Sequence, residues 1–222
     1  MRLLPYGDRA VLVELADPDG TDGTDQAVAS ARVVAWVEAA ATAWRDVPVE
    51  LVPAATTVLV ALAPGAPQDL AWLRAAAADV RPEQPARRAE APRTVEVPVT
   101  YDGADLAAVA RLTGLDEADV VAAHTGTPWR VAFGGFAPGF AYLVGGDPRL
   151  RSVPRRAEPR TRVPAGSVAL AGGFSGVYPR VSPGGWQLLG RTELAMWDLD
   201  RDPPALLAAG TTVRFVDAGG VR

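Results

Sequence analysis

The chain of 222 residues contains no cysteine, no lysine, no isoleucine and no asparagine, and its only histidine is His124. Without cysteine it forms no disulfide and offers no thiol nucleophile, and with a single histidine we expect no metal site. All 22 basic residues are arginine, so a Schiff-base lysine and a P-loop lysine are both excluded. Any anion that the chain binds must therefore be held by arginine side chains or by backbone N–H groups.

An excess of positive charge and long apolar runs are also lacking. The formal net charge is −4, whereas domains that bind nucleic acid are usually basic, so we expect no nucleic-acid partner. No run approaches the roughly 20 apolar residues of a membrane span. The start of the chain, from Met1 into Gly7 and Asp8, has no apolar segment of signal-peptide length. The sequence therefore predicts a soluble, cytoplasmic protein with no membrane partner.

The chain is 49% hydrophobic, which is enough for the buried core of one large domain or two small ones. Residues 1–82 are predicted to form a small α/β domain. Two passages from strand to helix in this region favour a ferredoxin-like sandwich. The expected strands are 10–15, 49–52 and 57–62, and the expected helices are 25–44 and 66–79.

The character of the sequence changes near the middle of the chain. Residues 83–94 are rich in proline, arginine, alanine and glutamate without apolar periodicity, so they are predicted to be a linker. Residues 95–222 begin with an alternating strand, and helices are expected at 105–112 and 116–124. From Trp129 onward, short apolar runs are broken by glycine and proline, which is typical of a β-barrel or sandwich with elaborate loops. The predicted fold class is α+β.

The segment 133–143, FGGFAPGFAYL, is the first candidate for a binding site. Its glycines can adopt positive φ and approach a ligand closely, and its aromatic side chains suit the floor of an apolar pocket. The alternative is a glycine-kinked barrel strand whose aromatic side chains belong to the core. The candidate residues here are Phe136 and Gly139.

Six arginines follow between positions 149 and 162, with Glu158 as the only acid among them. Guanidinium groups suit carboxylates and phosphates, and Pro154 and Pro159 stiffen the segment. The alternatives are a solvated basic loop and a loop that pairs with acids of another protein chain. Ligand or partner binding is favoured, with Arg155, Arg156 and Arg160 as the candidate residues.

Two turn-rich segments complete the tract, 163–173 and 182–187. Ser167 has no base nearby in the sequence, and the G-x-S-x-G elbow is absent, so a contact to an anion is favoured over a serine nucleophile. The second segment places a tryptophan and a glutamine toward a pocket or the core. The candidate residues in these turns are Gly166, Ser167, Ser182, Gly184, Gly185 and Trp186.

His124 has two interpretations. A lone histidine favours a core or helix-terminal position with satisfied hydrogen bonds, and it acts as a general base only if the barrel loops converge on it. The region 105–124 also has the look of a helix-turn-helix. Asp116, Glu117 and Asp119 would then start the second helix and repel DNA, which argues against that function.

Taken in order, these segments resemble one family, the B subunits of 5-oxoprolinase, also called allophanate hydrolase subunit 1, which includes the sensor-kinase inhibitor KipI. The resemblance rests on FGGFAPGFAYL, PRRAEPRTRVPAGSVALAGG and SGVYPRVSPGGWQLLGRT, and comparable segments extend it over essentially the whole chain. It implies a small N-terminal α/β domain followed by a cyclophilin-like β-barrel domain.

The resemblance also implies a function. The B subunit would act with the C subunit, a related barrel protein, and with the A subunit to open the lactam ring of 5-oxo-L-proline to L-glutamate with hydrolysis of ATP, and it would be active only in that complex. Mg-ATP would bind to this chain or to its partner. The arginine and glycine candidates would hold the substrate or ATP, with His124 as an acid or base. Two alternatives stay open: a KipI-like inhibitor of a sensor histidine kinase, and a carboxyltransferase-type protein that handles urea or allophanate.

Overall fold

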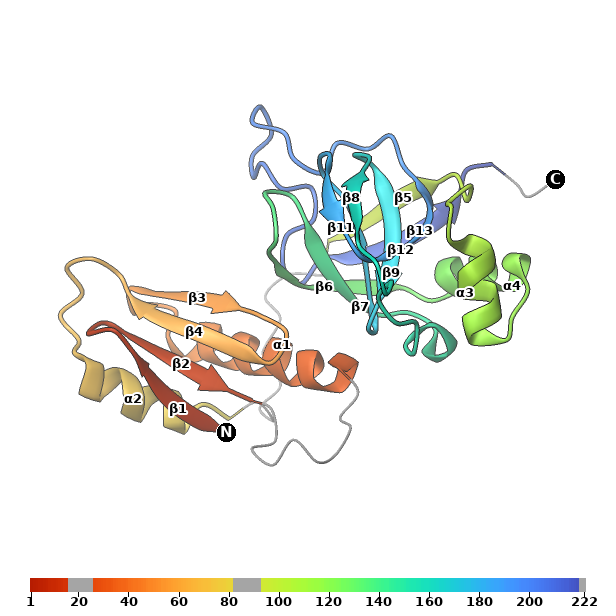
Figure 1. Cartoon of the computed structure of the whole chain (residues 1–222). Helices are drawn as coiled ribbons and strands as arrows, with labels where there is room; N and C mark the ends of the chain where they lie inside the picture. Colours follow the sequence, from red (N-terminus) through yellow and green to blue (C-terminus); the bar gives the residue numbers. More distant parts are fainter. Residues whose placement is uncertain (16–25, 82–92, 220–222) are drawn as a thin grey trace. The chain divides into compact units, whose positions relative to one another are not determined.

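The computed structural model describes residues 1–15, 26–81 and 93–219 (Figure 1). The chain divides into two compact units, Met1–Ala91 and Pro92–Arg222. Most of the predicted linker, residues 83–94, lies outside the described residues. Its last residue, Thr94, is already the first residue of a strand in the second unit.

The first unit is a four-stranded antiparallel sheet with two helices. The strands stand in the order β1-β2-β4-β3, so the chain runs β-β-α-β-β-α. A ferredoxin-like domain runs β-α-β-β-α-β, and that part of the prediction is not confirmed. The elements are β1 (Arg2–Tyr6), β2 (Ala10–Glu14), α1 (Gln26–Ala43), β3 (Val49–Pro53), β4 (Thr57–Leu62) and α2 (Leu70–Asp79).

Alternation along the strands decides which face of this sheet the helices cover. Val58 and Val60 of β4 are buried and stand opposite Val13 and Val11 of β2. Both helices contribute to the same apolar cluster, which includes the fully buried Trp36 of α1. One face of the sheet is therefore the core of the unit.

The second unit is mainly β-structure. Seven strands form one sheet in the order β12-β9-β10-β7-β6-β13-β5, and β8 pairs with β11. The strands are β5 (Thr94–Val99), β6 (Trp129–Gly134), β7 (Ala141–Gly145), β8 (Arg160–Val163), β9 (Ser167–Ala171), β10 (Phe174–Val177), β11 (Ser182–Gly184), β12 (Gln187–Arg191) and β13 (Thr212–Asp217).

The two edge strands of this sheet meet, so the sheet nearly closes into a barrel. Thr100, just after β5, and Arg191 of β12 exchange two backbone hydrogen bonds of 2.9 Å. A Cβ on Gly190 would contact the carbonyl oxygen of Thr100, so only glycine permits this approach. The mixed α+β fold is confirmed, and the nearly closed sheet is consistent with a cyclophilin-like barrel.

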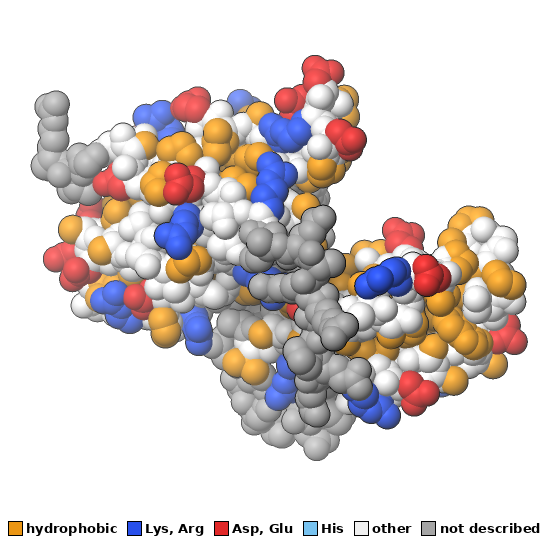
Figure 2. All heavy atoms as spheres, turned by 180° about the vertical axis from the view of Figure 1, so that it is seen from behind, with side chains coloured by type: hydrophobic (Ala, Val, Ile, Leu, Met, Phe, Trp, Pro, Cys, Tyr) orange, Lys and Arg blue, Asp and Glu red, His pale blue; other side chains and the backbone are white. Residues whose placement is uncertain are grey.

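Two helices, α3 (Leu106–Thr113) and α4 (Glu117–Gly126), pack on the barrel, and a short 3-10 helix, η1, spans Pro148–Leu150. They fall where the sequence predicts two helices, because Gly114 ends the first with φ +72° and Asp116 caps the second. The inner side of α4 is buried against the barrel. Figure 2 shows one face of the molecule, on which arginine and acidic side chains are mixed. No described helix is long and apolar enough to cross a membrane.

Candidate functional site

Seven aromatic rings pack together in the barrel unit, and we call them the aromatic cluster. Phe140 lies at its centre, with ring centroids 5.3 Å from Phe136, 5.4 Å from Tyr178 and 5.4 Å from Trp186, mostly edge to face. Most members are buried, but Phe136 and Tyr142 reach the surface. The members are Phe133, Phe136, Phe140, Tyr142, Phe174, Tyr178 and Trp186.

Phe136 has an unusual backbone for its residue type. Its φ is +65°, in the left-handed region that costs a non-glycine residue roughly 1–2 kcal/mol, yet its side chain is 58% exposed. The turn is fixed by hydrogen bonds from Ala137 N to Gly135 O (2.7 Å) and from Phe140 N to Ala137 O (2.9 Å). A strained backbone that holds an apolar side chain in solvent is a reason to look for function.

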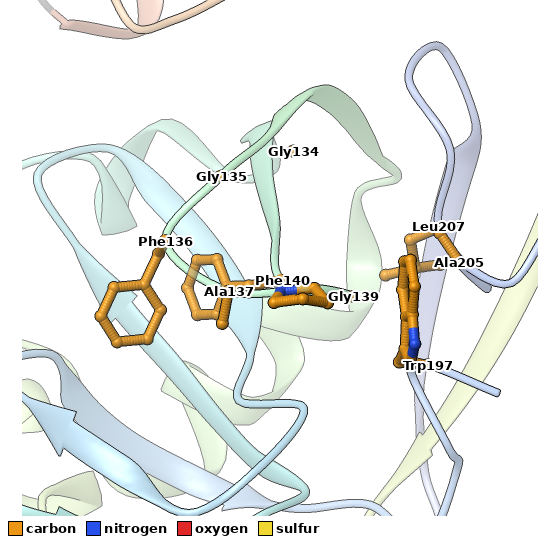
Figure 3. A pocket seen from close by; sticks show the side chains of 10 residues that line it. Gly134, Gly135, Phe136, Ala137, Gly139, Phe140, Trp197, Ala205 and Leu207 are labelled. Atoms are coloured by element: carbon orange, nitrogen blue, oxygen red, sulfur yellow. The ribbon is translucent and has the colours of Figure 1, made fainter. Parts of the chain in front are cut away.

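A groove adjoins this loop. It has a volume of about 470 Å³ and is formed by residues 134–140 together with Trp197, Ala205 and Leu207. In the view of Figure 3, Phe140 and Gly139 lie between Phe136 and Trp197. Gly139 (φ +82°) is required here, because a Cβ would lie 2.8 Å from the Cβ of Trp197.

Two of the three predicted binding arginines are paired with an acid that the sequence does not indicate. Arg156 Nη1 and Arg160 Nη2 both donate to Asp105 Oδ1, at 2.7 Å and 2.8 Å. The Leu188 N–H donates to Oδ2 at 2.8 Å. Burial acts to raise the pKa of Asp105, but the hydrogen bonds from Arg160 and Leu188 and the two positive charges outweigh it and lower the pKa. Asp105 is therefore ionised and shared by both guanidinium groups.

Arg155 is placed differently. Its backbone is anchored on both sides, since Pro154 O accepts from Gln187 Nε2 (3.2 Å) and Arg156 N donates to Gly185 O (2.8 Å). Among the described residues its exposed side chain has no hydrogen bond and no ion pair. Arg155 is thus held beside residues 185–187 with its charge available.

The charge of Arg155 acts on the aromatic cluster. Burial raises the pKa values of Tyr142 and Tyr178, and the positive charge of Arg155 opposes that rise at both phenols. The backbone N–H of Trp186 also acts to lower the pKa of Tyr178. The positive charge of Arg155, which has no ion pair among the described residues, is thus close enough to two phenols of the aromatic cluster to act on their pKa values.

Four of the predicted residues, Gly166, Ser167, Ser182 and Gly184, are buried or half-buried in the barrel unit. Gly166 N donates to Tyr178 O (2.8 Å), and a Cβ there would contact the carbonyl oxygen of Thr192. Gly184 lies against the Tyr178 hydroxyl in the same way. Ser167 and Ser182 are both buried, and the Ser182 hydroxyl has no hydrogen-bond partner among the described residues. The two glycines thus permit close packing, and the two serines belong to the interior of the unit.

His124 is fully buried in the barrel core. Tyr101 Oη lies 2.7 Å from Nδ1, and Ser175 Oγ lies 2.9 Å from Nε2. Because Ser175 Oγ donates its proton to Ala169 O at 3.3 Å, it accepts from Nε2–H, and Nδ1 of the neutral ring accepts from the phenol. Phe215 stacks on the ring at 4.2 Å. Burial lowers the pKa of His124 to about 3. This is the geometry of a core histidine, the first of the two interpretations that the sequence allows.

The structure therefore sorts the predicted residues into four groups, one of which is the closely packed set Gly166, Ser167, Ser182 and Gly184. Phe136, Gly139, Arg155, Gly185 and Trp186 gather around the aromatic cluster and form the candidate site. Arg156 and Arg160 are paired with Asp105, and His124 is a core residue. The sequence pattern did not single out Asp105 and Tyr101, because each meets its partner only through the fold.

The chain is a two-unit α+β protein, with a small α/β unit followed by a nearly closed barrel. Its candidate site lies on the barrel unit. The sequence model of the family "carboxyltransferase domain, subdomain C and D" matches residues 1–207, and the chain belongs to this family.

Curated relatives share one name, that of the B subunit of 5-oxoprolinase. The chain is 53% identical over 127 residues to the protein of that name from Escherichia coli O157:H7, and relatives from Bacillus subtilis (46%) and Haemophilus influenzae (45%) carry the same name. The match to the E. coli protein covers 56% of this chain and 58% of that protein. The chain thus spans less than two thirds of the curated relatives it matches.

Solved structures extend the similarity to nearly the full chain. The crystal structure of PH0987 from Pyrococcus horikoshii is 34% identical with a TM-score of 0.55, covering 99% of this chain and 98% of that one. A crystal structure of TTHA0988 is 35% identical with a TM-score of 0.71, covering 96% of this chain but 41% of that one.

Proposed function

We propose that the chain is the B subunit of an ATP-dependent 5-oxoprolinase complex, which opens 5-oxo-L-proline to L-glutamate together with the A and C subunits in the cytoplasm. The observation that carries the proposal is the 53% identity, over 127 residues, to a protein named as the B subunit of 5-oxoprolinase. All three of these curated relatives bear that name, so a kinase inhibitor is not favoured.

The reaction adds water across the ring amide. The carbonyl carbon takes the oxygen of water and becomes a carboxylate, the C–N bond breaks, and the nitrogen leaves as an ammonium group. A second water hydrolyses ATP to ADP and phosphate, and this hydrolysis drives the ring opening. The substrate is a small ring with one carboxylate, which suits a site with one unpaired guanidinium and aromatic walls.

Mg-ATP is proposed to bind outside this chain. A triphosphate carries several negative charges and requires several donors. At the candidate site, however, Arg156 and Arg160 are neutralised by Asp105. Of the three predicted arginines, only Arg155 has no ion pair among the described residues, and one guanidinium matches one carboxylate better than a triphosphate.

Exposed apolar side chains on the barrel unit support the proposal that a partner protein binds there. Phe136 is 58% exposed, Trp197 41% and Leu199 80%, and exposed apolar groups of this size are typical of interaction surfaces. We propose that the A and C subunits cover them and complete the site.

Reconstitution tests the proposal. The purified chain is mixed with the A and C subunits from the same organism, and phosphate and glutamate are measured with and without 5-oxo-L-proline. We expect both products only in the full mixture and only with 5-oxo-L-proline. Turnover with urea or allophanate in its place, or no turnover with the full set of three proteins, would contradict the proposal.

A further inference from the structure

We propose that Arg155 and the rim of the aromatic cluster form the subsite that holds the carboxylate and the ring of a carboxylated lactam. The rim consists of the two members that reach the surface, Phe136 and Tyr142. This inference rests on the proposed function for the identity of the substrate, and on the geometry of the barrel for the location of the subsite. Three features of the described residues lead to it: a fixed backbone, an uncompensated charge and an adjoining ring surface.

The backbone that carries Arg155 is fixed before any ligand arrives. Besides the two anchors at Pro154 and Arg156, Gly172 N donates to Val153 O at 2.7 Å. The segment is therefore hydrogen-bonded to the β9–β10 turn on one side and to residues 185–187 on the other. A side chain on a fixed backbone loses less conformational entropy when it binds an anion.

No acid among the described residues compensates the charge of Arg155, in contrast to Arg149, Arg156 and Arg160. Arg156 and Arg160 share Asp105, and Arg149 donates to Asp147 at 2.7 Å. A guanidinium group beside aromatic rings is less well hydrated than one in bulk solvent. An arriving carboxylate therefore forms a stronger, two-pronged hydrogen bond with it.

Charge alone does not distinguish Arg155, because Arg162 on β8 is also exposed and has no hydrogen bond or ion pair among the described residues. The difference is the surroundings. The charge of Arg155 reaches Tyr142 and Tyr178, whereas no electrostatic effect of Arg162 on these two described phenols is found. Arg162 is therefore the matched control for Arg155.

The aromatic side chains next to Arg155 would contact the lactam ring of the ligand. Tyr142 is half-buried, lies 5.6 Å from Trp186 between ring centroids, and stacks on Phe133 at 4.4 Å. Such a rigid wall offers a flat face to a five-membered lactam ring. A cation at one end and a flat apolar wall beside it fit a compact ring that bears one carboxylate.

The test is binding to the full chain in the presence of its A and C partners. Affinities for 5-oxo-L-proline and for 2-pyrrolidinone, the same ring without the carboxylate, are measured by calorimetry for the wild type, Arg155→Gln and Arg162→Gln. We expect Arg155→Gln to weaken 5-oxo-L-proline binding by about 10- to 100-fold, the effect of losing a charged hydrogen bond. Arg162→Gln should leave it unchanged, and 2-pyrrolidinone should bind weakly and equally to all three.

Steady-state turnover of the reconstituted complex separates this inference from the proposed function. Under the inference, Arg155→Gln raises KM by a similar factor while kcat changes little, and Arg155→Lys recovers part of the loss. Equal affinities for the two variants overturn the subsite even where turnover is normal. Arg155-dependent binding of 5-oxo-L-proline supports the subsite even where turnover fails, and only the proposed function is then lost.

Discussion

The barrel uses the same residue types in two different ways. In its buried networks, formed by Asp105 with Arg156 and Arg160 and by His124 with its hydroxyl partners, every named charge or ring nitrogen has a partner. At the rim, Arg155 and Phe136 are exposed, and Arg155 lacks such a partner among the described residues. Adjacent arginines thus have different tasks: Arg156 holds the fold, whereas Arg155 is available to a ligand.

This comparison predicts that changes in the buried networks lower stability, whereas changes at the rim affect binding. The largest effect is expected for Asp105→Ala. It removes the anion shared by two guanidinium groups and leaves the Leu188 N–H without an acceptor. Because the carboxylate is only 4% exposed, we expect the free energy of unfolding in urea to fall by about 3–5 kcal/mol.

Asp102→Ala is the control for this prediction. Asp102 pairs with Arg191 at 2.9 Å, but both side chains are about half exposed, so the loss should stay below about 1 kcal/mol. Equal losses for the two variants would show that burial does not distinguish the two ion pairs.

A second prediction concerns the packing beneath the rim. In Gly184→Ala the new methyl group meets the hydroxyl and ring of Tyr178, which is buried among other aromatic side chains. We expect the free energy of unfolding to fall by about 1–3 kcal/mol. In Gly185→Ala the nearest atom is Pro159 Cβ at 3.6 Å, so the change should stay within about 0.5 kcal/mol. Similar melting curves for both variants would contradict the close contact at Gly184.

The pH dependence of stability tests the second buried network. The pKa of His124 is lowered in the folded state to about 3, so the unfolded chain binds more protons below its ordinary pKa. Stability is then full above about pH 6.5 and declines as the pH falls, by about 2 kcal/mol between pH 7 and 5. The pKa of Asp105 is lowered, so its charge is lost only at still lower pH.

His124→Gln isolates this contribution. The variant cannot take up a proton at position 124, and although it is less stable overall, its stability should change less between pH 7 and pH 5 than that of the wild type. If urea titrations give both proteins the same pH slope, the histidine is not held neutral by the core.

The sequence predicted much of the fold because its signals are local. The alternating strand that begins at Val95 and the helix predicted over 116–124 are both confirmed, and Asp116 is the cap of that helix. Strand β1 was missed, since Arg2–Tyr6 has no clear alternation and contains a proline, which is tolerated at a sheet edge. The start of α2 was placed too early, because the cap is Asp69, whose side chain accepts from Trp72 N at 2.8 Å.

The sequence proposes candidate site residues one by one, but it does not distinguish the surroundings of one arginine from those of the next. Arg155, Arg156 and Arg160 are equivalent by composition, and they differ only because Asp105, 51 residues before Arg156, reaches two of them. His124 likewise had two open interpretations until Tyr101 and Ser175, 23 and 51 residues away, were found to surround it. Contacts of this separation are set by the closure of the barrel and leave no pattern in the sequence.

The smallest effect on stability, and the sharpest test of the rim, is expected for Phe136→Asn. Asparagine tolerates the left-handed backbone at this position, so relief of strain offsets the lost ring contacts, and the free energy of unfolding should change by less than about 1 kcal/mol. Association with the A and C partners, measured by calorimetry, should nevertheless weaken, because an apolar contact is lost.

Leu112→Asn is the control, since Leu112 is a similarly exposed apolar side chain on α3. Partner affinity that falls equally in both variants would place the contact surface elsewhere than at the rim.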